Sequence, residues 1–171
     1  MNEVEALARQ AISDLDFYEK LEKDPGALDC QIVHFLQMAG EKAAKAVLYA
    51  LNPHFRMDEA GNRKLSHVAL SMLMPALSRR ESLHQSLGLP AATVRAKLKA
   101  YRRLYAAIEE LHPEMTQGRV NSEYPWERGG DWIAPCNHPF GILADLRAGD
   151  GPEAVYFIRQ LARCAPSIAR R

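Results

Sequence analysis

Apolar residues recur at helical spacing most regularly over residues 31–51. Steps of three and four connect Ile32, Leu36, Ala39, Ala43, Val47 and Ala50, and this stripe predicts an amphipathic helix packed in a core. The opposite side carries polar residues, namely Gln31, His34, Gln37, Glu41 and Lys45. Glu41 precedes Lys45 by four residues, so the two charges are expected to pair on adjacent turns. We therefore predict a central helix with a buried aliphatic side and an available polar side.

The same periodicity predicts a helix before it. Asn2 and Glu5 have the spacing of a capping box, so a helix is expected to begin there and to continue through an apolar stripe as far as Tyr18. Residues 24–26 read Asp-Pro-Gly, a turn that also provides a first-turn proline for the next element. The first two helices should form an antiparallel pair.

Three further helical segments follow. Residues 65–86 have a helical pattern in which Pro75 removes a backbone donor, so we expect a kink or a split there. Residues 91–111 form the next helix, whose apolar side contains Val94, Leu98, Tyr101, Tyr105, Ile108 and Leu111. A last helix is expected to begin at residues 151–153.

Between these helices, residues 112–150 lose all periodicity and are rich in proline and glycine. A segment of this length is uncommon in a compact domain unless it is functional or disordered, and its many aromatic residues favour order. Residues 119–124 are expected to pair with residues 131–134 as a short β-hairpin across residues 127–130.

These elements predict an all-α fold, an up-and-down bundle of four to five helices with one long aromatic-containing loop. We expect a single domain spanning residues 1–171, with residues 112–150 as a loop insertion before the last helix. The chain shows no internal repeat and no long linker.

Composition narrows the class of protein. Lys and Arg number 22 against 21 Asp and Glu, so the net charge of +1 produces no global attraction to nucleic acid or membrane. Three cysteines without a CxxC pair fit reduced thiols better than a disulfide framework. No apolar run approaches the roughly 20 residues of a membrane span, and no signal peptide is evident. We expect a soluble, cytoplasmic protein without membrane contact.

A basic side on the helix over residues 91–111 is the main candidate binding surface. It consists of Arg95, Lys97, Lys99, Arg102 and Arg103. Such a cluster is either a solvated helix face or a strip that contacts phosphates, where each neutralised phosphate adds salt-dependent affinity. Two loop residues extend the second interpretation, giving a predicted nucleic-acid-binding set of Arg95, Lys99, Arg102, Arg103, Arg119 and Tyr124.

Several segments resemble a known family. Gln31, Gln37 and the run Glu41-Lys42 followed by Lys45-Ala46-Val47-Leu48 look like the central helix of HEPN domains, whose members carry Q-x-A-E-K-x-x-K-A-x-L. Residues 64–70, Lys-Leu-Ser-His-Val-Ala-Leu, are similar to the family's next helix. Residues 121–125 resemble its Arg-Tyr-Pro segment, with Glu123 at the arginine's position. The resemblance covers roughly residues 6–125.

The resemblance implies a small helical bundle that forms a homodimer. Family members act as RNA-cleaving toxins, as partners of minimal nucleotidyltransferases, or as non-catalytic interaction domains in defence systems. Our preferred hypothesis is a HEPN-like module without catalysis that acts with RNA or a nucleotidyltransferase-type protein. An active endoribonuclease toxin and an interaction bundle of another family remain the alternatives.

Catalytic HEPN domains use an arginine, four to six intervening residues and a histidine, without a metal. In such a site a histidine can move the ribose 2′-hydroxyl proton while the arginine stabilises charge on the phosphate. Arg79 and His84 meet this spacing and are the candidate catalytic pair. The other interpretation is an exposed helix end.

No other constellation predicts a cofactor or metal. Cys136 and His138 are two potential ligands where a structural zinc needs four. Phosphate-binding glycine loops, HExxH and GxSxG motifs do not occur in the chain. His34 and His67 are expected on neighbouring helices, either sharing a buried hydrogen bond or forming a base-and-partner pair.

Overall fold

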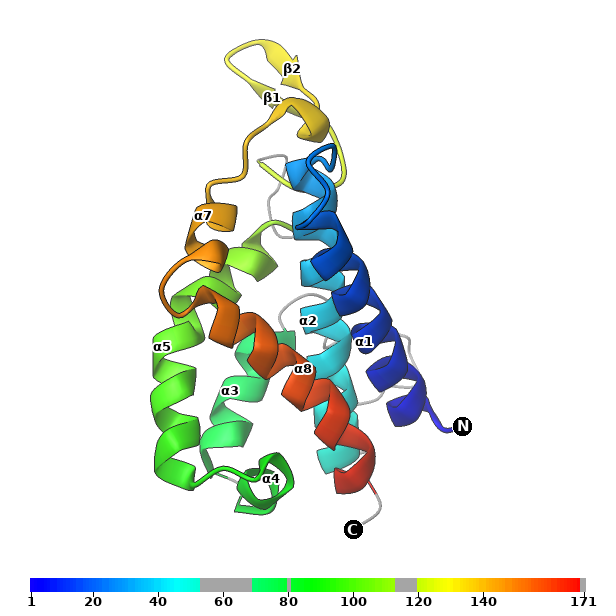
Figure 1. Ribbon diagram of the computed structural model, residues 1–171, viewed down its shortest axis with the longest axis vertical. Helices are drawn as coiled ribbons and strands as arrows, with labels where there is room; N and C mark the ends of the chain where they lie inside the picture. The colour runs from blue at the N-terminus through cyan, green and yellow to red at the C-terminus, as the bar shows by residue number, and fades with distance from the viewer. Residues whose placement is uncertain (53–68, 80, 113–119, 170–171) are drawn as a thin grey trace.

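The computed structural model describes residues 1–52, 69–79, 81–112 and 120–169. Its helices are α1 (Glu3–Leu21), α2 (Asp29–Leu51), α3 (Ala69–Arg79), α4 (Glu81–Leu87), α5 (Ala91–Glu110), α7 (Ile142–Arg147) and α8 (Gly151–Ile168). Between α5 and α7 lie the strands β1 (Trp126–Arg128) and β2 (Asp131–Ile133) and the short 3-10 helix η2 (Pro135–Asn137). Figure 1 shows a helical bundle with a small β-hairpin at one end, so the predicted fold class is confirmed.

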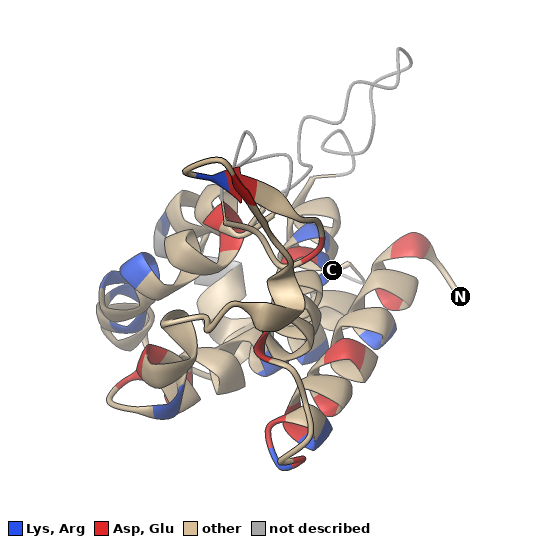
Figure 2. Ribbon diagram, turned by 90° about the horizontal axis from the view of Figure 1, so that it is seen from above, with Lys and Arg blue, Asp and Glu red and all other residues tan. Residues whose placement is uncertain are grey.

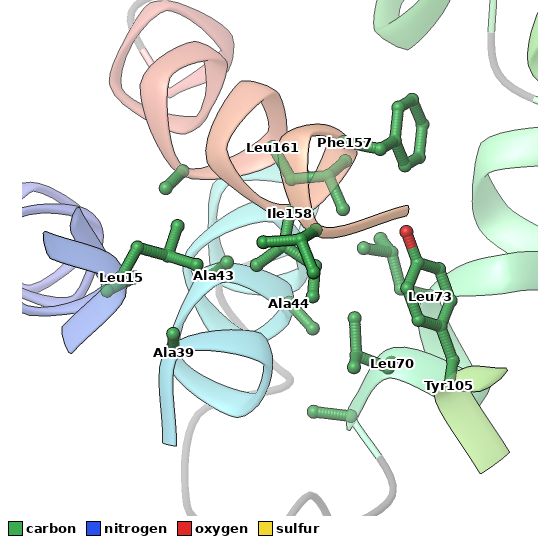
Figure 3. Packing of buried hydrophobic residues seen from close by; sticks show 14 of the residues in the cluster. Leu15, Ala39, Ala43, Ala44, Leu70, Leu73, Tyr105, Phe157, Ile158 and Leu161 are labelled. Carbon is green, nitrogen blue, oxygen red and sulfur yellow. The ribbon is translucent and has the colours of Figure 1, made fainter. Parts of the chain in front are cut away.

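Helix α2 occupies the centre of the bundle. It packs against α1, α8, α3 and α5 along its length and against η2 near its beginning. Small residues allow these close approaches, and Ala39, Ala43 and Ala44 are fully buried between α1, α8 and α3 (Figure 3). At Gly40 even a methyl group would come within 2.8 Å of Leu70 Cδ1, so α3 lies directly against the α2 backbone. The prediction of a central core helix is confirmed.

The predicted availability of the polar side of α2 holds only in part: Gln31 is exposed and His34 is half-buried, but the middle of this side is covered. Gln37 is buried, and its Oε1 accepts a hydrogen bond from Ser122 Oγ at 3.1 Å. Glu41 and Lys45 do form the expected ion pair, but both side chains are largely covered. The sequence pattern does not predict the burial of Gln37, because a polar residue on a helix can be covered by a polar partner from a distant segment. Here that segment is residues 120–124, which contains Ser122.

Two helix boundaries depend on local backbone chemistry. The capping box at Asn2 and Glu5 is present, so α1 begins as predicted. Helix α3 continues through Pro75 as far as Arg79, so Pro75 does not end the helix. Helix α4 begins at Glu81, and residue 80 between them lies outside the described residues. Proline at position 75 removes only the helical donor to the Ser71 carbonyl, and the remaining turns of α3 keep their hydrogen bonds.

The β-hairpin is present, but its first strand is Trp126–Arg128 and not the predicted residues 119–124. Trp126 pairs with Ile133, Glu127 with Trp132 and Arg128 with Asp131, across a turn made by Gly129 and Gly130. Both glycines have positive φ, 64° and 90°, which a two-residue hairpin turn of this type requires. The tight turn therefore sets the register, and residues 120–124 lie outside the strand pair. The predicted involvement of residue 119 falls outside the described residues.

Candidate anion-binding groove between α3 and α5

Helix α5 presents two different basic surfaces. Its apolar side is buried against the bundle through Val94, Leu98, Tyr101, Tyr105 and Ile108. Lys97 turns toward α8, where its Nζ lies 2.7 Å from Glu153 Oε2 and 3.1 Å from the Tyr101 hydroxyl. The hydrogen bond to the Glu153 carboxylate is the main cause that raises the pKa of the Lys97 ammonium. Lys97 thus joins α5 to α8, unlike the rest of the basic side.

Arg95, Lys99 and Arg102 face α3 instead. Steps of four and three residues place them along one side of α5, over an axial distance of about 10 Å at 1.5 Å per residue. Together with α3 they border a groove of about 560 Å³. The other lining residues are Ser71, Met74 and Pro75 of α3 and Leu98, Tyr105 and Ala106 of α5. In Figure 2, α5 lies at the left edge with its Lys and Arg positions in blue.

The groove combines an apolar lining with unneutralised positive charge. Within the described part of the chain, Arg95, Lys99 and Arg102 make no ion pair and no side-chain hydrogen bond. Three cations within two turns, with no carboxylate among the groove's lining residues, give this surface a local charge that the net charge of the chain conceals. The arrangement suits an anion that also carries apolar surface.

Glu109 of α5 is hydrogen-bonded to Ser71, one of the α3 residues that line the groove. Its side chain is 6% exposed, and Oε1 accepts a hydrogen bond from the Ser71 backbone N–H at 3.1 Å. The Ser71 hydroxyl donates to the second carboxylate oxygen. Burial raises the pKa of Glu109, and the hydrogen bonds from Ser71 oppose that rise. Glu109 therefore fixes the first turn of α3 to α5 and sets the spacing of the groove walls.

The structure brings together part of the predicted nucleic-acid-binding set. Arg95, Lys99 and Arg102 share the groove, whereas Arg103 is exposed on α5 without lining it. Tyr124 is 61% exposed next to the β-hairpin and does not line the groove. Arg119 lies outside the described residues. The contribution of Ser71, Met74 and Pro75 was missed, since no pattern in the sequence indicates which side of α5 would meet α3.

The two residues of the candidate catalytic pair lie in different environments. Arg79 is exposed at the end of α3, whereas the side chain of His84 is 7% exposed on α4. His84 Nε2 lies 2.6 Å from the Leu77 carbonyl oxygen and donates to it, because a carbonyl can only accept. That carbonyl belongs to the last turn of α3, where carbonyl groups have no N–H donor within the helix. His84 thus closes the end of α3.

Two further histidines contact neighbouring side chains within the described residues. His138 lies edge-on to both Trp126 and Phe140, with ring centroids 5.1 Å from each. His34 Nδ1 lies 3.5 Å from Glu123 Oε1, while its expected neighbour His67 is outside the described residues. The described residues contain no group of three or more His, Cys, Asp or Glu side chains placed to hold a metal ion.

Comparison of the chain with models of known families, with curated proteins and with solved structures finds no match in any of the three. In the described ranges, none of the helices combines the length and the hydropathy needed to cross a membrane.

Proposed function

We propose that this chain is a HEPN-like helical module that binds RNA through the groove between α3 and α5 without cleaving it. The observation that carries the proposal is the row of three unpaired cations, Arg95, Lys99 and Arg102, above an apolar lining. The HEPN kinship itself is supported by the sequence resemblance and by the central position of α2 in a helical bundle.

The groove matches the two kinds of surface that a single RNA strand presents. Phosphates can pair with Arg95, Lys99 and Arg102, where arginine adds bidentate hydrogen bonds to its charge. Bases and riboses can contact the apolar lining, which includes Met74 and Leu98. The affinity for RNA should depend moderately on salt. A plot of log K against log[salt] should have a slope of roughly −0.7 per neutralised phosphate, or about −2 for three.

A binding role without catalysis is supported by the state of His84. Its Nε2 is committed to the Leu77 carbonyl in the protein interior, so the ring is not presented to a ligand as a general base or acid would be. Cleavage of RNA in metal-free buffer that His84→Ala abolishes would establish the alternative, an endoribonuclease. We expect no such cleavage.

The test is fluorescence anisotropy of a labelled single-stranded RNA. The triple variant Arg95→Gln/Lys99→Gln/Arg102→Gln should bind at least about tenfold more weakly, since each lost phosphate contact reduces a counterion-driven affinity. A matched control, Arg9→Gln/Lys23→Gln/Arg163→Gln, removes the same charge from exposed positions elsewhere. An equal loss of RNA affinity in the two triple variants, or no loss in either, would contradict specific binding in the groove.

The resemblance also implies a homodimer and a nucleotidyltransferase-type partner protein, in a toxin–antitoxin or defence system. The free thiols of Cys30, Cys136 and Cys164 favour a reducing compartment such as the cytoplasm for this activity. Copurification with a minimal nucleotidyltransferase encoded beside this chain would support that partner.

A further inference from the structure

A proline in α3 leaves one backbone acceptor beside the groove. Pro75 has no backbone N–H, so the carbonyl of Ser71, four residues earlier, lacks its ordinary helical donor. In an α-helix this hydrogen bond lies between residue i and residue i+4 along the helix surface. Because Ser71 and Pro75 are both exposed and both line the groove, the missing bond lies on the groove side of α3.

The other polar groups of the lining are donors or are already engaged. The three cations of the groove carry only N–H donors. The Ser71 hydroxyl donates to Glu109, and the Tyr105 hydroxyl donates to the Ala154 carbonyl oxygen at 3.0 Å. The Ser71 carbonyl is therefore the acceptor that a ligand in this groove meets, opposite side chains that can only donate.

Nucleobases differ in what they present to such an acceptor. Cytosine and adenine each carry an exocyclic amino group, whereas uracil has a carbonyl oxygen at the position of the cytosine amine. An amino group can donate to the Ser71 carbonyl, but the uracil oxygen would face it as a second acceptor. Hydrogen-bonding sites discriminate most strongly against an analogue that leaves their polar groups unpaired.

A single nucleotide is the unit that the groove accommodates. Its volume of about 560 Å³ is within the usual range of about 300–1,000 Å³ for pockets that take small ligands. In a double helix the amino groups would be engaged in base pairs, whereas the edges of unpaired bases are open to hydrogen bonding. Any selection by the Ser71 carbonyl is therefore a selection among unpaired bases.

We propose that the Ser71 carbonyl selects bases with an exocyclic amino group, so that the groove binds cytosine- and adenine-containing strands in preference to uracil-containing ones. This inference rests on the proposed binding of single-stranded RNA. The three cations on α5 hold phosphates, and phosphate contacts carry no sequence information. The base lies against α3, where Met74 provides apolar contact beside the acceptor. Affinity and selectivity thus come from different walls of the groove.

The experiment is fluorescence anisotropy of labelled single-stranded RNAs of equal length, oligo(C) and oligo(U). The two strands carry the same number of phosphates, so a difference in affinity reports the bases. The wild-type chain should bind oligo(C) at least about fivefold more tightly, as expected for one hydrogen bond that is made in one complex and left unpaired in the other.

A second pair of strands isolates the amino group. Adenine should be preferred to unsubstituted purine, which differs from it only in lacking the exocyclic amine. Equal affinities within either pair of strands would overturn the proposal. These comparisons use the wild-type chain, so they hold independently of how any variant folds.

Pro75→Ala tests the acceptor itself. The substitution gives residue 75 an N–H that donates to the Ser71 carbonyl, and alanine is the best helix former, so we expect α3 to be kept. The preference for oligo(C) over oligo(U) should disappear, while the phosphate contacts remain. Pro166→Ala is the matched control, because Pro166 also lies inside a helix, α8, and does not line the groove. A preference that survives Pro75→Ala, or that Pro166→Ala abolishes, would overturn the proposal.

Failure of this inference and failure of the proposed function give different results. The triple variant Arg95→Gln/Lys99→Gln/Arg102→Gln should weaken the binding of oligo(C) and oligo(U) by the same factor, since it removes phosphate contacts. If both strands bind equally well and the triple variant weakens both, only the selection of bases is contradicted. If neither strand binds, or if the triple variant binds as the wild type does, the RNA-binding function fails and this inference fails with it.

Discussion

Glu109 of α5 accepts hydrogen bonds from both the backbone N–H and the hydroxyl of Ser71, in the first turn of α3. The carboxylate therefore caps a helix to which it does not belong. Negative charge is favourable at a helix N-terminus because several N–H groups there have no helical partner. The contact fixes the separation of the two helices that border the groove.

Replacing Glu109 with alanine should destabilise the protein by about 1–3 kcal/mol, because buried N–H groups of α3 lose their acceptor. The free energy of unfolding from urea denaturation measures this. Glu110→Ala is the control, since Glu110 is the exposed neighbour on the same helix and its removal should stay within about 0.5 kcal/mol. Equal effects of the two substitutions would show that the cap contributes nothing.

Glu109 should also make stability depend on pH. Burial raises its pKa in the folded protein above the ordinary 4.5, so the folded state holds this proton more tightly than the unfolded state. The resulting stabilisation is full below pH 4.5 and is lost as pH rises through the folded-state pKa. Compared with Glu109→Gln, the wild type should therefore lose stability over this interval. The free energy of unfolding of both proteins is measured at each pH. The same pH dependence in the two proteins would contradict a raised pKa of Glu109.

His84 and Arg79 should differ sharply when truncated. His84→Ala removes a buried side chain and leaves the Leu77 carbonyl without its donor, for an expected cost of about 2 kcal/mol. Arg79→Ala changes an exposed position and should cost less than about 0.5 kcal/mol. Thermal denaturation of both variants provides the comparison. A stable His84→Ala protein would reopen the question of why this histidine is buried.

Lys42 and Asp14 form a coupled pair between α2 and α1. Lys42 Nζ lies 2.6 Å from Asp14 Oδ2, and Gln10 Nε2 donates to the other carboxylate oxygen at 2.8 Å. Because Asp14 is buried, Lys42→Met should cost about 3–5 kcal/mol by leaving an uncompensated charge.

Adding Asp14→Asn should restore part of the stability lost in Lys42→Met, since the second change removes the buried charge. A double-mutant cycle measured by denaturant unfolding gives the coupling energy, expected between about 0.5 and 3 kcal/mol. Additive effects would mean that the two side chains are solvated independently.

Hydrophobic periodicity determined most of the helices on its own. The α2 stripe, the capping box at Asn2 and the beginning of α8 depend on neighbours within a few residues, so they can be predicted from the sequence. The Gly129-Gly130 turn is local in the same sense, and the second strand begins at Asp131 as predicted, whereas the first strand lies at Trp126–Arg128 instead of residues 119–124. In each case the residues that decide the feature are neighbours both in the sequence and in the structure.

Tertiary structure alone decided which polar residues face solvent and which face each other. Gln37 is buried because Ser122, 85 positions away, lies against it. Lys97 is turned away from Arg95, Lys99 and Arg102 because it pairs with Glu153 of α8. Arg95, Lys99 and Arg102 become a candidate site only through the approach of α3, which Glu109 fixes. A sequence shows the periodicity of one helix, but the side that meets another helix is set by the packing of the whole bundle.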